Sequence, residues 1–334
     1  MGKNTKINKV NFIKKYAIVD LHLHLDGSLS KKAILKVAKH DKIKLQKDFC
    51  LKVPKNCASL NEYLKCFEVP NFALQSKFGL KTCAKDLLKR LAKNGIKYAE
   101  IRMAPQLSCQ KELKQEKVVQ TLLKSFKKCE KYGIYANLIL CMMRGNDTHE
   151  ANKITANVAK KFLGRGVVAV DLAGAEGLFK NELFETELSL VRDLGVPLLI
   201  HAGEASGAES VKSALKYEPK RIGHGIKSAS DEKLLKTLKK RKICLEICPK
   251  SNLDTKTILN LAHLPIKKFL DFGVKFTINT DNMSVSNTNL YKEYKRIYKL
   301  GFDEKFLKNC AKNAIIYSFA NKKLKKSLLA LLDF

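Results

Sequence analysis

The sequence predicts an α/β protein built as a (β/α)8 TIM barrel, with extra helices in the connection after the first strand and at the C-terminus. Short apolar segments alternate with helical patterns eight times along the chain. Strand alternating with helix is typical of a parallel sheet with right-handed connections, and eight such units close a barrel. The length of 334 residues suits one barrel, so we expect a single domain over residues 1–334. An open doubly wound sheet is the structural alternative.

Eight segments have the composition of buried strands, and each is bounded by Gly, Pro, Asn or Asp. In the first of them, alternation along a strand places His22 and His24 on one side and the leucines on the other. The eight segments are residues 17–25, 98–105, 136–144, 167–174, 197–204, 221–225, 244–252 and 275–282.

Between these segments, apolar residues recur at three- and four-residue spacing, which predicts amphipathic helices, for example over residues 112–133, 231–242 and 266–273. The first connection, residues 26–97, is much longer than a simple loop. It contains at least two helical patterns, residues 31–40 and roughly 59–93, and we expect it to cover the mouth of the barrel. The tail after residue 302 predicts further helices.

The composition is that of a globular protein without a membrane span. It is 45% hydrophobic and 29% charged, and no apolar run approaches the roughly 20 residues that cross a bilayer. The N-terminal stretch lacks the apolar core of a signal peptide. The ten cysteines include no CxxC pair, so we expect reduced thiols and a cytoplasmic location.

The formal charge of +32 raises the alternative of a polyanion-binding protein. The excess is nearly all Lys, spread along the whole length, and no basic tract is interleaved with aromatic residues. We therefore interpret it as a Lys-rich background on solvated helix faces and expect no specific nucleic-acid partner.

Polar residues collect where the predicted strands end, which in a barrel of this type is where the active site lies. The three other histidines, His40, His149 and His263, fall in helical or loop positions and are expected at the surface. The residues at strand ends are His22, His24 and Asp26 on the first strand, His201 and Glu204 on the fifth, His224 on the sixth, and Asp281 and Asn282 on the eighth.

Three imidazoles and one carboxylate match the ligand set of a catalytic zinc that keeps a position open for water. Taken alone, His201 fits a satisfied core histidine and Asp281 fits a helix cap. The HExxH pattern and the cytidine-deaminase pattern H-x-E with P-C-x-x-C are absent from the sequence. The fourth strand ends without the Lys that bridges two metals, which favours one metal.

Metal-assisted hydrolysis also needs groups that move protons. His224 and Asp281 are placed to act on the water, while Glu204, three residues after His201, is placed to reach the substrate. The alternative is that Glu204 only orients the His201 ring. These residues support hydrolysis and leave the substrate open.

The motifs HLHLDG, YAEIRMAPQ, DLAGAEG, HAGE, RIGHG, LEICPKSN and INTDN together resemble the adenosine deaminases of the amidohydrolase superfamily, especially the bacterial members. They follow the family order along about nine-tenths of the chain. The resemblance implies a zinc-dependent hydrolase that converts adenosine and 2′-deoxyadenosine into inosine and 2′-deoxyinosine plus ammonia, as in purine salvage.

The resemblance also implies residue roles. Glu204 would protonate N1 of the purine, His224 would orient the water and stabilise the developing oxyanion, and Asp281 would accept the water proton. Gly174 would offer its N–H to purine N3, and Asp26 would hold the 5′-hydroxyl of the ribose. Leu64 and Phe67 would form part of an apolar lid. The implied ligands of one Zn²⁺ per subunit are His22, His24, His201 and Asp281, and His24 would also face the substrate.

One position departs from the family. Many members have Asp-Asp where this chain has Asp281-Asn282. The second residue contacts purine N7, which is an acceptor, and an Asn amide donates a hydrogen bond at any pH. We therefore predict that the NH2 group of Asn282 binds N7.

Asp26 also separates the neighbouring families. Adenine deaminases tend to have Glu at this position, and AMP deaminases have no acid there, since a carboxylate would repel a phosphate dianion. The alternatives are an adenine deaminase, an N6-modified AMP deaminase, and a metal-free barrel that binds polyanions. We expect a small purine nucleoside and water as ligands, no membrane partner, and a monomer or weak dimer.

Overall fold

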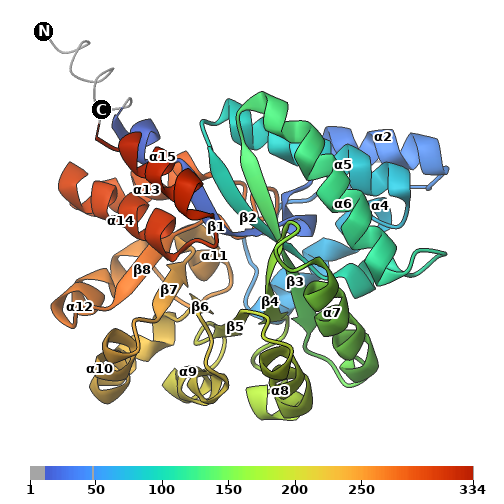
Figure 1. Ribbon diagram of the computed structural model, residues 1–334. Coiled ribbons are helices and arrows are strands. Elements are labelled where there is room, and N and C mark those ends of the chain that lie inside the picture. The colour runs from blue at the N-terminus through green and yellow to red at the C-terminus, as the bar shows by residue number, and fades with distance from the viewer. Residues whose placement is uncertain (1–11, 47–48, 334) are drawn as a thin grey trace, which may run out of the picture.

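Eight parallel strands form the centre of the molecule, as predicted. The computed structural model describes residues 12–46 and 49–333. The strands follow one another in sequence order around a single sheet, with helices outside them (Figure 1). Their bounds are β1 Val19–His24, β2 Tyr98–Met103, β3 Tyr135–Met143, β4 Val167–Ala173, β5 Leu198–Ala202, β6 Arg221–His224, β7 Cys244–Ile247 and β8 Lys275–Ile278.

The sheet closes through the chain just after β8. Leu23 and Asp281 form an isolated parallel bridge. The N–H of His24 donates to the Asp281 carbonyl at 2.8 Å, and the N–H of Asp281 donates to the His22 carbonyl at 2.7 Å. This closure confirms the barrel and excludes the open doubly wound sheet. It also joins three of the predicted metal ligands through the backbone.

The helices alternate with the strands, and the predicted ones over residues 112–133, 231–242 and 266–273 are present as α6, α10 and α12. The helix bounds are α2 Lys31–Asp41, α3 Leu60–Leu64, α4 Glu68–Ala73, α5 Lys77–Lys93, α6 Gln115–Cys129, α7 His149–Phe162, α8 Glu185–Asp193, α9 Ala208–Ala214, α10 Glu232–Lys240, α11 Pro249–Asp254, α12 Ile266–Asp271, α13 Leu290–Lys299, α14 Glu304–Tyr317 and α15 Lys322–Ala330.

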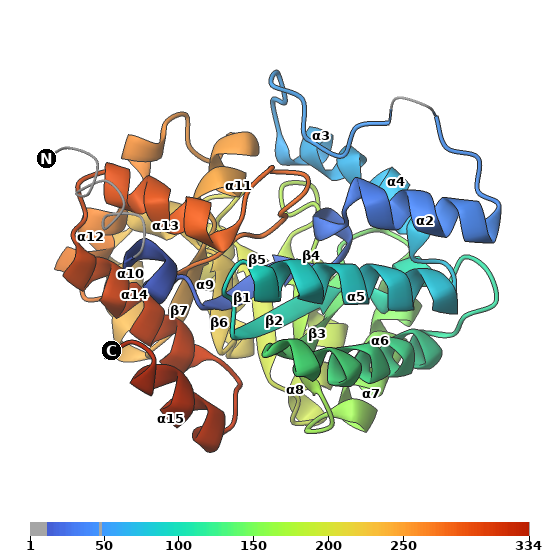
Figure 2. The same ribbon diagram turned by 90° about the horizontal axis from the view of Figure 1, so that it is seen from above.

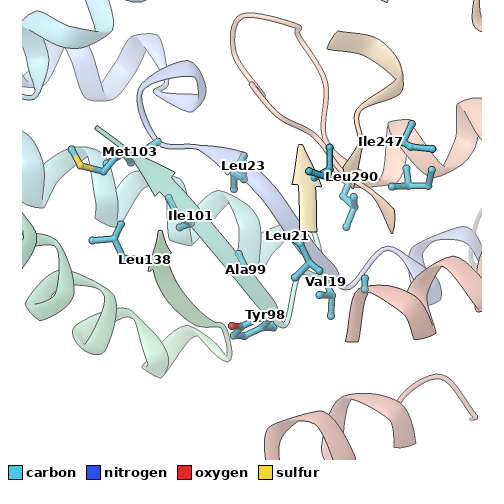
Figure 3. Packing of buried hydrophobic residues seen from close by; sticks show 14 of the residues in the cluster. Val19, Leu21, Leu23, Tyr98, Ala99, Ile101, Met103, Leu138, Ile247 and Leu290 are labelled. Carbon is cyan, nitrogen blue, oxygen red and sulfur yellow. The ribbon is translucent and has the colours of Figure 1, made fainter. Parts of the chain in front are cut away.

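The alternation of β1 separates the core from the site. Leu21, Leu23 and Leu25 are fully buried and belong to the main hydrophobic cluster. Figure 3 shows two of these leucines near Ala99 and Ile101 of β2. His22 and His24 point the other way, into the barrel, as the period of two requires.

The first connection covers the barrel mouth. Figure 2 shows α2, α3 and α4 together on one side of the barrel. The predicted helix over residues 59–93 is broken into α3, α4 and α5, and Ser59 and Ser76 accept backbone hydrogen bonds at the starts of α3 and α5. The Tyr63 hydroxyl lies 2.8 Å from the Ser286 hydroxyl, which ties α3 to the loop after β8.

Two further segments differ in detail from the sequence expectation. The predicted strand over residues 244–252 ends at Ile247, because Pro249 begins α11, and Pro is favoured in the first turn of a helix. The tail forms α14 and α15, as expected. Within the described residues, no helix is long and apolar enough to cross a membrane.

Candidate active site

The predicted site residues meet in one cavity at the carboxyl ends of the strands. The cavity has a volume of about 240 Å³. Leu60, Leu64 and Phe67 of the first connection form an apolar part of its wall. His22 lies below it and is fully buried. The other predicted site residues, His24, Asp26, Gly174, His201, Glu204, His224, Asp281 and Asn282, all line the cavity.

Three of the four predicted metal ligands, His22, His24 and His201, form one group with metal-binding spacing, and Asp281 lies close to two of them. His24 Nε2 lies 3.3 Å from His22 Nε2 and 3.4 Å from His201 Nε2. Asp281 Oδ1 lies 3.5 Å from His22 Nε2 and 3.4 Å from His24 Nε2. Ligand atoms about 2.1 Å from one tetrahedral centre are about 3.4 Å apart. The donor set therefore fits a divalent metal ion such as zinc.

The outer nitrogens of two of these histidines are bound by buried carboxylates. His22 Nδ1 lies 2.9 Å from Glu246 Oε2, and His201 Nδ1 lies 3.0 Å from Asp171 Oδ2. A carboxylate accepts a hydrogen bond only from a nitrogen that carries hydrogen. Each Nδ1 is therefore protonated, and each Nε2 keeps its lone pair for a metal. The carboxylate that orients His201 is thus Asp171, and the alternative role of Glu204 is wrong.

Arg102 holds both orienting carboxylates. Its guanidinium donates to Asp171 at 2.8 Å and to Glu246 at 2.6 Å, and all three side chains are fully buried. The Arg102 charge is the main cause that keeps the pKa of Glu246 well below its usual range, against the opposing effect of burial. Sequence analysis did not identify these residues. The sequence signal that could have indicated them is a single charged residue on the inward-facing side of each of the strands β2, β4 and β7.

Cys248 is a second buried group near the metal ligands. It forms a cluster with His22, His224 and Asp281 that has metal-binding spacing. Burial, followed by the negative charge of Asp281, raises the pKa of the Cys248 thiol well above its usual range. The thiol also donates to the Glu246 carbonyl at 3.5 Å. A thiol binds metal as thiolate, so this environment favours the three histidines and Asp281 as ligands.

His224 projects into the cavity from a constrained backbone. Its φ of +59° lies in the left-handed region. Asn252 Nδ2 donates to His224 Nδ1 at 3.0 Å, while Asn252 Oδ1 accepts the Cys248 N–H at 3.3 Å, which fixes the orientation of the amide. Burial lowers the pKa of His224 well below its usual range. A neutral ring that accepts at Nδ1 carries its proton on Nε2, the nitrogen nearest Glu204.

Glu204 has the properties of a proton donor. Its Oε2 lies 3.3 Å from His224 Nε2, and the Thr255 hydroxyl lies 3.1 Å from its Oε1. Burial raises the pKa of Glu204 well above its usual range, and the negative charges of Asp281 and Glu176 raise it further. These effects favour the protonated carboxylic acid, which is the form that can donate a proton.

The remaining predicted residues lie on the substrate side of the cavity. Asp26 accepts the Gly27 N–H at 3.0 Å, and burial raises the pKa of Asp26 to about 6. The Asn282 carboxamide oxygen is buried and has no hydrogen-bond partner among the described residues. It packs so closely against Gly27 that a Cβ atom on that residue would lie 1.8 Å from it. Gly174 has a φ of +106°, a backbone conformation that glycine adopts without steric strain because it has no Cβ.

Comparison with known proteins identifies the family of this chain. The family model described as "Adenosine deaminase" matches residues 18–333. An adenosine deaminase of Haemophilus ducreyi is 43% identical and covers 95% of this chain and 96% of its own length. An adenosine deaminase of Clostridium acetobutylicum is 40% identical over 94% of this chain and 96% of its own length.

Solved structures of more distant proteins share the fold. The adenine deaminase of Arthrobacter aurescens has a TM-score of 0.85 and 24% identity, and the match covers 95% of this chain and 98% of that one. The Arabidopsis N6-mAMP deaminase has a TM-score of 0.86 and 23% identity, with 97% and 99% covered. The family model and the identity along nearly the whole chain show that this protein belongs to the adenosine deaminase family of hydrolases.

Proposed function

We propose that this enzyme uses one zinc ion per subunit to deaminate adenosine and 2′-deoxyadenosine, which gives inosine or 2′-deoxyinosine and ammonia. The observation that carries the proposal is that His24 Nε2 lies 3.3–3.4 Å from the Nε2 atoms of His22 and His201, with Asp281 Oδ1 3.4–3.5 Å from His24 and His22, at a cavity that is also lined by the buried Glu204. The identity of 40% or more to adenosine deaminases supports the same substrate class.

The proposed ligands are His22, His24, His201 and Asp281. A bound divalent ion supplies Lewis acidity, which makes water a nucleophile at neutral pH. Glu246 and Asp171 keep the Nε2 atoms of His22 and His201 free of protons, so the ligand set is formed before any ion binds. A structural neighbour of the same fold contains bound zinc, which supports the choice of metal.

In the proposed reaction, Glu204 and His224 stabilise the two charges that develop on the substrate. Glu204 gives its proton to purine N1 as the oxygen of water adds to C6. His224, with its proton on Nε2, donates a hydrogen bond to that oxygen and does not act as the base. Asp281 accepts the proton of the water through its carboxylate and returns a proton to the 6-amino group as the C6–N bond breaks, which releases ammonia.

Three residues bind the substrate in this proposal. Gly174 offers its backbone N–H to purine N3, and Asn282 donates to N7. Because the Asn282 oxygen is buried against Gly27, the NH2 end is the one available to the cavity. The Asp26 carboxylate accepts the 5′-hydroxyl of the ribose. Leu64 and Phe67 cover the purine and exclude water.

The test is the rate of ammonia release, together with the change in purine absorbance, for adenosine, adenine and AMP. We expect adenosine to be the preferred substrate by kcat/KM. Glu204→Gln should be folded but inactive, because an amide has no acidic proton to give, and Glu182→Gln, at an acid outside the site, should match the wild type. Preference for adenine, or for AMP and its N6-substituted forms, would overturn the substrate assignment.

We further propose a cytoplasmic monomer or weak dimer with no specific nucleic-acid partner. All ten cysteines lie among the described residues and none is in a disulfide, which supports a reducing compartment. The three histidines predicted at the surface, His40, His149 and His263, lie there, with exposed side chains.

A further inference from the structure

The Glu176 carboxylate contacts the loop of residues 203–206 and is surrounded by hydrogen-bond donors. Glu176 follows β4, and its residue is only 2% exposed. Its Oε1 accepts the Ser210 hydroxyl at 2.5 Å. The two carboxylate oxygens also accept four successive backbone N–H groups, those of Gly203, Glu204, Ala205 and Ser206, with N···O distances of 2.6, 3.0, 2.7 and 3.2 Å.

Four successive amides directed at one point form a concave site of positive potential that favours an anion. Gly203 permits this turn, because its φ of +71° is in the left-handed region. No other hydrogen bond is recorded for these four N–H groups among the described residues. One carboxylate therefore binds all four N–H groups of the loop, whereas the carbonyls of Gly203 and Glu204 accept from Lys227 and Thr257.

Glu204 is one of the four residues so held, and its carboxyl group also contacts His224 Nε2 at 3.3 Å. The Thr257 hydroxyl donates to the Glu204 carbonyl at 3.2 Å, and the Thr255 hydroxyl contacts its Oε1. The backbone of Glu204 is thus held at its N–H by Glu176 and at its carbonyl by Thr257.

We propose that Glu176 is a positioning residue, which fixes the backbone of residues 203–206 and so holds the Glu204 carboxylic acid where it protonates the purine. This inference rests on the proposed role of Glu204. The hydrogen bonds from residues 203–206 are the basis for this role, and the charge of Glu176 supports it. After burial and Asp281, the negative charge of Glu176 is the next cause that raises the pKa of Glu204.

The site is accessible from outside the active-site cavity. A second cavity, of about 490 Å³, is lined by Glu176, Ser206, Ser210 and Glu182. A small ion from solvent can reach the four amides through this cavity once the Glu176 side chain is removed. Formate has the shape and charge of the missing carboxylate, which makes chemical rescue possible.

The experiment measures kcat and KM for adenosine in the zinc-loaded Glu176→Ala enzyme, with and without formate. We expect kcat to fall about 100-fold, the size of effect that a small misplacement of a catalytic group causes, while KM changes little. Formate should restore much of the lost rate. Formamide, which has the same shape and no charge, should not restore it.

Glu182→Ala is the matched control. Glu182 lines the same second cavity and accepts the Ser213 hydroxyl at 2.5 Å, but no contact to the amides of residues 203–206 is recorded for it. We expect wild-type kcat and no response to formate. Glu176→Asp, which keeps the charge on a shorter side chain, should keep more activity than Glu176→Ala.

Three results would overturn the inference: an unchanged kcat in Glu176→Ala, a loss that formate does not restore, and equal rescue by formamide. If Glu176→Ala does not fold, Glu176→Gln decides in its place. Its NH2 group faces an N–H donor, so kcat should fall, and an unchanged kcat would contradict the inference. Wild-type enzyme without activity on adenosine would refute the proposed function instead. If the wild type is active and Glu204→Gln is inactive, a negative result with the Glu176 variants contradicts only the role proposed for Glu176.

Discussion

His224 and Asp281, the two residues proposed to act on water, both have φ angles in the left-handed region, +59° and +60°. Such a conformation costs a residue other than Gly about 1–3 kcal/mol and persists only where the surroundings enforce it. Asp281 is held by backbone hydrogen bonds to His22 and His24. Five other non-glycine residues also have positive φ, and His224 and Asp281 are the two of the seven in the described part of the chain that line the cavity.

Asp26 gives the first prediction at the scale of single residues. Asp26→Ala should lower kcat/KM for adenosine about 10- to 100-fold, because a hydrogen bond to a charged group contributes about 1.5–3 kcal/mol. The 5′-deoxyadenosine substrate has no 5′-hydroxyl and should lose much less. Steady-state kinetics with both substrates measures the difference, and equal losses would show that Asp26 does not bind the ribose.

Asn282 gives the second prediction. Asn282→Ala should lower kcat/KM for adenosine about 3- to 10-fold, the range expected for one neutral hydrogen bond. With 7-deazaadenosine, which has no N7 acceptor, the same substitution should have no effect. The ratio of the two losses is the measurement. If both substrates were affected equally, or neither, the N7 contact would be wrong.

At the scale of elements, α11 controls the ring of His224. Its residue Asn252 is fully buried and donates to His224 Nδ1, which places the imidazole proton on Nε2. In Asn252→Asp, the carboxylate keeps the bond from the Cys248 N–H but accepts from Nδ1 and raises the pKa of His224. The imidazolium still donates from Nε2, so the variant should be active at acidic pH.

Above the raised pKa of His224, the neutral ring of this variant has its proton on Nδ1, and donation from Nε2 is lost. We therefore expect kcat of Asn252→Asp to fall as pH rises, over a range where the wild-type kcat stays constant. The pH profile of kcat in both enzymes is the measurement. Parallel profiles would indicate that Asn252 does not set the position of the proton.

Local sequence patterns predicted the elements well, for a physical reason. Alternation of apolar residues defines buried strands, and the period of 3.6 defines helices, so both follow from short stretches of sequence. The division of residues 59–93 into three helices was missed, because Ser59 and Ser76 start helices inside one continuous apolar pattern. Strand ends were predicted less well where Pro249 starts a helix.

The partners of the predicted site residues could not be predicted in the same way. Asp171, Glu246 and Glu176 act through contacts with residues distant in sequence, and single charged residues in apolar strands do not indicate which group they meet. The positive φ of His224 likewise depends on the folded surroundings. Motifs thus predicted the reacting groups, and only the fold shows which side chains orient them.

At the scale of the whole molecule, the charges are divided between interior and surface. Among the described residues, ten Asp or Glu residues are buried, whereas the buried cations are three arginines and no lysine. Two of these arginines, Arg102 and Arg221, bind Glu246 and so connect the barrel interior to His22, a proposed metal ligand. The lysines of the described residues therefore lie at least partly exposed, which agrees with the interpretation of the +32 charge as a solvated surface.

We propose that one metal ion, held by this donor set, is required for the hydrolysis of adenosine. The most direct measurement is a titration of chelated, metal-free protein with zinc, which follows adenosine turnover and bound zinc together. We predict no turnover without metal and a linear rise that ends at one zinc ion per chain. Full turnover in the metal-free protein, or zinc-loaded protein that leaves adenosine unchanged, would contradict the account.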